Sequence, residues 1–227
     1  MKGTLVNTTT VIVGSGIGLW VGHRLPENIK RIVLQAMGLV TILLGIQMAL
    51  KTESVLILIG SLVLGGITGE LLKIEEALEE VGEYLKKKVK SESGNFVLGF
   101  VSASLLFCVG PMTVVGSLED GLFGKADLLY IKSVLDGFAS LILSSGLGIG
   151  VLFSFLTVLI FQGSLTLLGN QLEFILREDI ITEMSAAGGL LIVGIGLQLL
   201  EIKKIKVANL LPTLIYAVIL AYLKGYI

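Results

Sequence analysis

Lys132 and Asp136 have the residue types and the spacing that most directly suggest chemistry in this chain. Residues four apart stack on one face of a helix, and the surrounding stretch 127–146 is apolar and long enough to cross a bilayer. Asp136 lies nine residues into that stretch, where an isolated charge is costly unless it faces the protein interior. Such acids commonly mark ion or substrate paths, so we predict that both residues belong to a binding site. Two alternatives remain: a pair that only fixes packing, and a loop, if the span begins after Gly137.

A second group of candidate residues surrounds a helix breaker, Gly110-Pro111. Proline lacks an amide hydrogen and clashes with the preceding turn, so the span around it is expected to kink or break. Backbone groups freed at that depth need partners from protein or from water in a cavity, because lipid offers none. Ser104 and Thr113 place small polar groups near the break, which favours a binding role over a purely structural kink. Gln162, inside another apolar stretch, is the remaining candidate.

The composition is that of a membrane protein. Hydrophobic residues make up 54% of the chain and charged residues 15%, and the mean hydropathy is +0.93. Apolar runs of the length that a helix needs to cross the hydrocarbon core recur along the whole chain. They predict an all-α membrane protein of about eight transmembrane helices, near 4–22, 31–50, 55–72, 96–115, 127–146, 147–168, 184–201 and 207–224. These spans leave no room for a soluble catalytic domain, so 1–227 is predicted to be a single membrane domain.

Two parts of the chain resemble each other. Residues of the second predicted span return in the seventh at a constant offset: Ala36, Gly38, Leu39, Gly45 and Gln47 match Ala187, Gly189, Leu190, Gly196 and Gln198. The match predicts a first repeat, 4–72, and a second repeat, 147–224, on either side of the central spans 96–146. The loop of the first copy is basic and that of the second is acidic, so the copies should have opposite orientations. Inverted repeats are the architecture of many secondary transporters, whose sites lie between the copies near the midplane.

Basic residues gather in three segments, 23–31, 73–92 and 201–206. Because Lys and Arg are retained in the cytoplasm, all three are predicted to be cytoplasmic, which places both termini outside. The protein is then expected to be multi-pass in the plasma (inner) membrane of a prokaryote, with the lipid bilayer as a partner. Six crossings are the alternative, if part of 96–150 is re-entrant. The segment 73–92 carries an apolar stripe at helical spacing, which predicts an amphipathic helix on the cytoplasmic surface.

Several classes of function find no support in the residues. No zinc, haem or iron–sulfur ligand set is apparent, so neither a metal nor a cofactor is predicted. The net charge of −1 gives no reason to expect a nucleic-acid partner. The sole histidine, His23, lies in a loop and no nucleophile–base pair is apparent, so an enzyme is not expected. Glycines four apart, at Gly14, Gly18 and Gly22, predict close helix packing; unwound backbone at a binding site is the alternative.

Three motifs carry a resemblance to a known family. They are Gly-Thr-x-x-Asn at Gly3–Asn7, a Gly-Pro step followed by Gly-Ser-x-x-Asp-Gly-Leu at Gly110–Leu122, and Lys-Ser-x-x-Asp-Gly at Lys132–Gly137. With these motifs, essentially the full chain resembles the uncharacterised YqgA/YdfK-like family of bacterial inner-membrane proteins. The resemblance implies a polytopic protein, often described as a possible transport protein, without an established substrate or mechanism.

Taken together, the repeat, the broken fourth span and the charge near the midplane favour a secondary transporter of a small solute or ion. An oligomeric ion channel is the alternative, because a homo-oligomer of this chain could line a pore that the monomer lacks. A structural membrane protein with no transport is the third reading. A transporter saturates and couples to a gradient, whereas a channel does neither, so flux measurements separate the first two.

Overall fold

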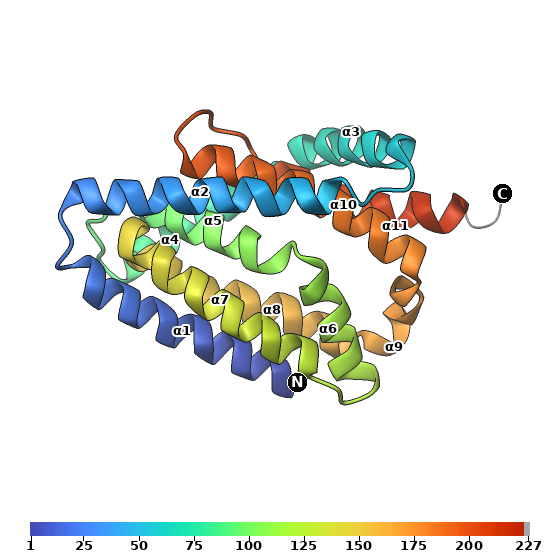
Figure 1. Cartoon of the computed structure of the whole chain (residues 1–227), viewed down its shortest axis with the longest axis horizontal. Helices are drawn as coiled ribbons and strands as arrows, with labels where there is room; N and C mark the ends of the chain where they lie inside the picture. The colour runs from blue at the N-terminus through green and yellow to red at the C-terminus, as the bar shows by residue number, and fades with distance from the viewer. Residues whose placement is uncertain (225–227) are drawn as a thin grey trace.

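The computed structural model describes residues 1–224, and every regular element within that range is a helix (Figure 1). The longer helices are α1 (Lys2–Gly22), α2 (Glu27–Ala49), α3 (Val55–Leu72), α4 (Ile74–Lys88), α5 (Phe96–Cys108), α6 (Pro111–Leu122), α7 (Asp127–Leu147), α8 (Ser154–Leu167), α10 (Glu178–Leu199) and α11 (Pro212–Lys224). The short elements are η1 (Ile149–Val151), α9 (Gly169–Leu172), η2 (Glu173–Leu176) and η3 (Ala208–Leu210). The predicted all-α class is thus confirmed for the described residues.

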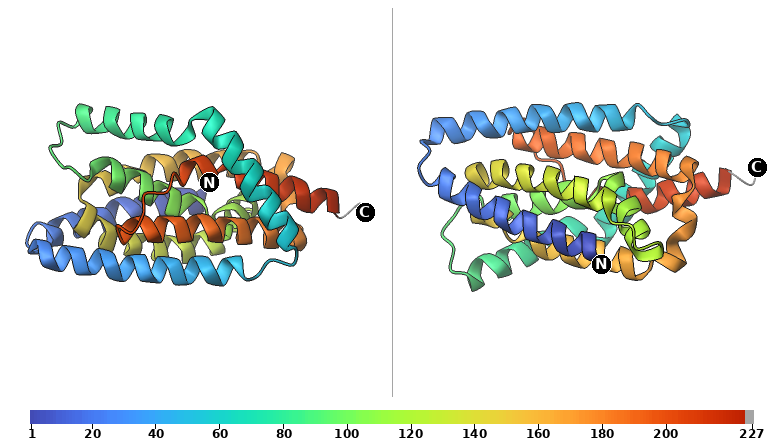
Figure 2. Two further views of the ribbon diagram at one scale, coloured as in Figure 1. Left: turned by 90° about the horizontal axis from the view of Figure 1, so that it is seen from above. Right: turned by 60° about the horizontal axis from the view of Figure 1, so that its bottom comes forward.

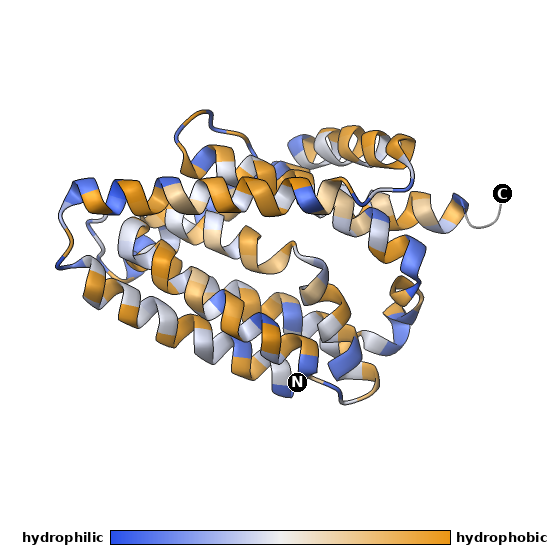
Figure 3. Ribbon diagram, in the orientation of Figure 1, coloured by the Kyte–Doolittle hydropathy of each residue, from blue (hydrophilic) through white to orange (hydrophobic). Residues whose placement is uncertain are grey.

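The number of membrane-crossing helices follows from their length and composition. Within the described residues, six are long and apolar enough to cross a membrane: α1, α2, α3, α7, the run of η1 with α8, and α10. Hydrophobic residues recur along the whole length of these helices, as the colouring by hydropathy shows (Figure 3). The pair α5 and α6 would count as a seventh if it forms one span, and Ala208–Lys224 is a shorter apolar helix. The structure therefore supports six to seven candidate spans.

All three prolines of the chain stand at helix starts. Pro26 is the residue before α2, and Pro111 and Pro212 are the first residues of α6 and α11. A missing amide hydrogen costs nothing in the first turn, and the fixed φ of proline suits that position. Gly148, with a φ of +82°, ends α7 where the fifth predicted span gives way to the sixth. A glycine adopts this backbone conformation without the strain that a side chain would add.

The connections between the helices gather at two ends of the bundle (Figures 1 and 2). The segments 23–26, 89–95 and 200–207 lie at one end. The N-terminus, the acidic segment that contains α9 and η2, and the end of α11 lie at the other (Figure 1). The connections 23–26, 89–95 and 200–207 carry basic residues, and most of the predicted basic segment 73–92 forms α4, which extends from this end along the bundle (Figure 2). Their assignment to the cytoplasm stays a prediction.

Close helix pairs hold the bundle together: α1 packs on α7, α2 on α10, and α3 on α11. Glycines make the approach of α1 to α7 possible, because a methyl group at Gly14 would overlap the Gly137 carbonyl oxygen. A methyl group at Gly18 would overlap that of Leu141 in the same way. Small residues permit such contacts between helices in lipid, where hydrophobicity does not drive helices together. The stripe Gly14, Gly18 and Gly22 thus has the predicted packing role.

The predicted amphipathic helix is α4, which is fixed to the segment that precedes α11. Lys206 pairs with Glu76 of α4 at 2.9 Å and also with Glu70, near the end of α3, at 2.8 Å. The buried Glu75 carboxylate accepts a hydrogen bond from the Ala208 amide at 2.8 Å. Burial raises the pKa of Glu75, although the Ala208 amide acts in the opposite direction. This helix is therefore anchored to the bundle by specific contacts in addition to its apolar stripe.

Candidate functional site

Lys132 and Asp136 lie inside α7 and form a buried ion pair. Their residues are 5% and 7% exposed, and the ammonium of Lys132 donates to Oδ2 of Asp136. Nδ2 of Asn7 donates to the same oxygen at 2.9 Å, so α1 supplies a third member of the cluster. The Lys132 ammonium also lies 6.0 Å from the ring centroid of Phe107, near the end of α5. These contacts rule out the loop alternative for the pair, since both residues belong to a helix that packs inside the bundle.

Asn7 is a site residue that the sequence reasoning did not single out. Its side chain is fully buried, and its Oδ1 atom has no hydrogen-bond partner among the described residues. The signal was present, because an amide side chain within an apolar span needs partners that lipid cannot provide. What the sequence could not show is that α1 brings Asn7 to Asp136.

A second buried carboxylate, Asp120, lies near the end of α6 and was also missed. It accepts a hydrogen bond from the Gly3 amide at 3.0 Å and pairs with the amino group of Met1 at 2.8 Å. Next along α1, the hydroxyl groups of Thr4 and Thr166 lie 3.4 Å apart. Polar contacts therefore continue from the end of the bundle that holds the N-terminus into its interior.

Gln162 lies on α8 with its side chain fully buried, and neither atom of its amide has a hydrogen-bond partner among the described residues. Ser117 on α6 is also buried, and its hydroxyl group has no hydrogen-bond partner among the described residues. Gly121 of α6 lies against the backbone of Thr166 of α8. Ser117 precedes Gly121 by about one helical turn, and Gln162 precedes Thr166 by the same separation. Ser117 and Gln162 therefore lie at one level of the bundle. Buried polar atoms are nearly always satisfied, so this level is one where a water molecule or a polar solute would find partners.

At Gly110-Pro111 the chain bends by 60° between α5 and α6. The hydroxyl group of Thr113 donates to the carbonyl oxygen of Phe107 at 2.8 Å, which satisfies a backbone group that the break frees. Nothing lies within 4 Å of the position that a Cβ of Gly110 would take, so this step borders open space. Thr113 therefore has a structural role here, and Gly110 and Pro111 are the more accessible part of the break.

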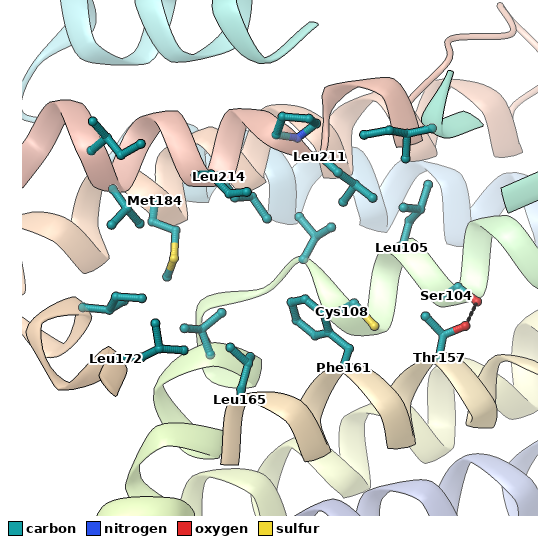
Figure 4. A pocket seen from close by; sticks show the side chains of 18 of the residues that line it. Ser104, Leu105, Cys108, Thr157, Phe161, Leu165, Leu172, Met184, Leu211 and Leu214 are labelled. Carbon is teal, nitrogen blue, oxygen red and sulfur yellow. Dashed lines mark hydrogen bonds between the residues drawn. The ribbon is translucent and has the colours of Figure 1, made fainter. Parts of the chain in front are cut away.

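Ser104 lies apart from the ion pair, on the wall of a cavity of about 880 Å³ (Figure 4). Its hydroxyl group is 2.9 Å from that of Thr157 on α8. The cavity also reaches Cys108 and Val109 at the end of α5, but the residues that line it do not include Lys132, Asp136 or Gln162. Its lining is mostly apolar. Of the predicted site residues, Ser104 lines this cavity and the ion pair does not, and their function stays a prediction.

The three motifs that carry the family resemblance meet in the bundle. The Gly3–Asn7 motif contacts the Gly110–Leu122 motif through Asp120, and it contacts the Lys132–Gly137 motif through Asp136. Leu129 fits against both Gly3 and Gly116, which holds α1, α6 and α7 at close range. The most specific residues of the sequence therefore share one region of the fold, around the buried ion pair.

Comparisons with known proteins agree with that resemblance. A family model described as "protein of unknown function (DUF554)" matches residues 2–222. The uncharacterized membrane protein YdfK of Bacillus subtilis is 33% identical over 219 residues, which cover 95% of this chain and 93% of that protein. The uncharacterized protein YqgA of Escherichia coli is 28% identical over 222 residues, which cover 95% and 94%. No solved structure matches. The chain belongs to the DUF554 family, which the resemblance of its motifs to YdfK and YqgA predicts.

Proposed function

We propose that the protein is a secondary transporter of a small solute or ion, with its site between α1, α6, α7 and α8. The observation that carries this proposal is the buried pair Lys132 and Asp136. The amide of Gln162, which has no hydrogen-bond partner among the described residues, lies on α8, which packs against α1 and α6. Ionisable groups within membrane helices are costly, and they commonly mark substrate or ion paths. A solute that offers a cation can replace Lys132 beside Asp136, and one that offers an anion can replace Asp136 beside Lys132. The amide of Gln162 then offers both a donor and an acceptor.

The inverted repeat is part of this proposal, and the crossing of α2 and α10 supports it. Gly38 lies against the backbone of Gly196, and Gly45 lies against that of Gly189. In the sequence alignment of the repeats, Gly38 matches Gly189 and Gly45 matches Gly196. Each contact is therefore the counterpart of the other, which is the pattern that a two-fold axis between two helices produces. The two helices run in opposite directions, as inverted copies require (Figure 1).

Eight crossings complete the proposed topology. Ala208–Lys224 comprises 17 residues, which as a helix extend about 25 Å, close to the thickness of the hydrocarbon core. The pair α5 and α6 begins at the end with the basic segments and finishes at the opposite end, which favours one broken span over a re-entrant loop (Figure 1). With eight crossings both termini lie on the same face, and the basic segments assign that face to the outside.

Single cysteines introduced in a Cys108→Ala background test this topology. Labels at 86–90 and 203–206 should react with a membrane-impermeant maleimide only from the cytoplasmic side, and labels at 175–179 only from outside. The reason is the separation of basic and acidic segments to opposite ends of the bundle. Labelling of 86–90 and 175–179 from one side would contradict both the topology and the inverted repeat.

The transport proposal is tested by a flux screen on proteoliposomes, with Gln162→Leu as the informative variant. Leucine removes two buried polar atoms that have no partner among the described residues, so stability should be unchanged or higher, whereas flux should fall about tenfold or more. Gln47→Leu is the matched control, because Gln47 is exposed on α2 and should not affect flux. Flux that rises linearly with solute concentration would indicate a channel. Normal transport by both Gln162→Leu and Asp136→Asn would show that these residues do not form the transport site.

A further inference from the structure

The cavity beside the helix break is a second feature of the fold that needs an explanation. Its walls come from α4, α5, α6, α8, α10 and α11 and from the segment of α9 and η2. Among the described residues that line it, only Ser104, Cys108, Thr157 and Tyr222 have polar side-chain atoms. We propose that this cavity binds one acyl chain of a membrane phospholipid.

The chemistry of the walls favours hydrocarbon over water or a polar solute. The hydroxyl groups of Ser104 and Thr157 are directed at each other at 2.9 Å, so they do not require a polar ligand (Figure 4). Apolar cavities stay dry, as water needs several polar partners there. An unfilled cavity would deprive the side chains around it of dispersion contacts on one side. A flexible alkyl chain supplies those contacts without a polar group to satisfy.

The cavity opens toward the surface of the bundle that would face lipid. Ile215, Ile219 and Leu223 of α11 line the cavity and are also 64%, 45% and 53% exposed. Across the opening lie Phe161 and Leu165 of α8 (Figure 4). In a helix that crosses a bilayer, such exposed apolar residues contact hydrocarbon. A phospholipid can therefore place one chain between α8 and α11 without leaving the membrane.

The dimensions of the cavity also match a lipid chain. Its lining residues on and just before α11 extend from Leu211 to Leu223, a separation of about 18 Å along a helix. One leaflet accounts for about half of a hydrocarbon core of roughly 30 Å, so an acyl chain of one leaflet fits this length.

The end of the cavity at Tyr222 suits the interfacial part of a lipid. The rings of Phe174 and Tyr222 are 5.7 Å apart in an edge-on arrangement, and the guanidinium of Arg177 lies 5.6 Å from the Tyr222 ring. Aromatic and basic residues are enriched where membrane helices reach the headgroups. We therefore place the ester end of the lipid beside Tyr222 and the chain terminus toward Ile74 of α4.

Native mass spectrometry of the purified protein tests the inference first. The full chain should retain one phospholipid, and the paired variant Leu214→Phe with Val218→Phe should lose it, because both residues line the cavity and added rings fill it. Ile131→Phe with Leu135→Phe, on the exposed face of α7, is the matched control and should keep the lipid. Equal retention by the filled and control variants would overturn the proposal, as would a lipid-free dimer.

Tryptophan fluorescence in vesicles of phosphatidylcholine with brominated acyl chains provides the second measurement. The reporters are built in a Trp20→Phe background, since Trp20 is the sole tryptophan. Phe161→Trp, in the cavity, should be quenched nearly as strongly as Phe138→Trp on the exposed face of α7 and several-fold more than the buried Phe100→Trp. Filling the cavity should reduce the quenching of Phe161→Trp alone. Stronger quenching by aqueous iodide than by bromine would show a wet cavity and overturn the proposal.

Discussion

Removing both charges of the buried pair at once, by Lys132→Met with Asp136→Asn, should leave the free energy of unfolding within about 1 kcal/mol of the unaltered protein or raise it. This variant leaves no unpaired charge at the position of the pair, and the introduced asparagine would still offer an oxygen to Nδ2 of Asn7. Asp136→Ala alone should instead cost about 3–5 kcal/mol, because it leaves the Lys132 ammonium buried without its partner.

Reversible unfolding in mixed micelles measures this contrast, and flux measurements on the same variants separate structure from function. If the pair is a transport site, the double variant should fold normally and transport at less than about a hundredth of the normal rate, since about 3 kcal/mol of binding is a factor near 150. Asp136→Asn should abolish transport, whereas its free energy of unfolding should fall only in part. A double variant that folds and transports normally would show that the pair only fixes packing.

The helical spans could be predicted from sequence because each depends on local composition. The apolar runs predict α1, α3 and α7 nearly with their observed bounds. Gly110-Pro111 predicts the break between α5 and α6. The starts of α2 and α10 were misplaced by several residues, since both helices begin with polar residues outside the apolar run: Glu27 and Glu178. Hydropathy measures what lies in lipid, whereas a helix continues as far as its hydrogen bonds do.

The candidate site was predictable only in part, because its geometry depends on which helices are neighbours. Lys132 and Asp136 are four apart on one helix, so their pairing could be read from spacing. Asn7 and Asp120 are joined to their partners across more than a hundred residues, and nothing in their local sequence indicates those partners. The apolar cavity is not predictable from the sequence, because its walls come from the apolar faces of helices whose proximity only the fold reveals.

The contact of α1 with α7 holds Asn7 against Asp136, so one methyl group at the helix seam should disturb the whole site. In Gly14→Ala the new methyl group would overlap the carbonyl oxygen of Gly137 and the hydroxyl group of Ser140. Neither backbone can yield locally, so α1 has to move away from α7, at a cost of about 1–3 kcal/mol for an overpacked contact. The hydrogen bond from Asn7 to Asp136 should lengthen as a consequence, and transport should fall with it.

Gly16→Ala is the matched control, since it lies two residues along the same helix, and nothing occupies the space within 4 Å of its Cβ position. Alanine favours a helix over glycine by about 1 kcal/mol, so this variant should be as stable as the unaltered protein or more so. Glycine-to-alanine substitution should therefore lower the free energy of unfolding at Gly14 and maintain or raise it at Gly16. Equal stability of Gly14→Ala and Gly16→Ala would mean that α1 and α7 do not approach this closely. The position of Asn7 beside the ion pair would then need another cause.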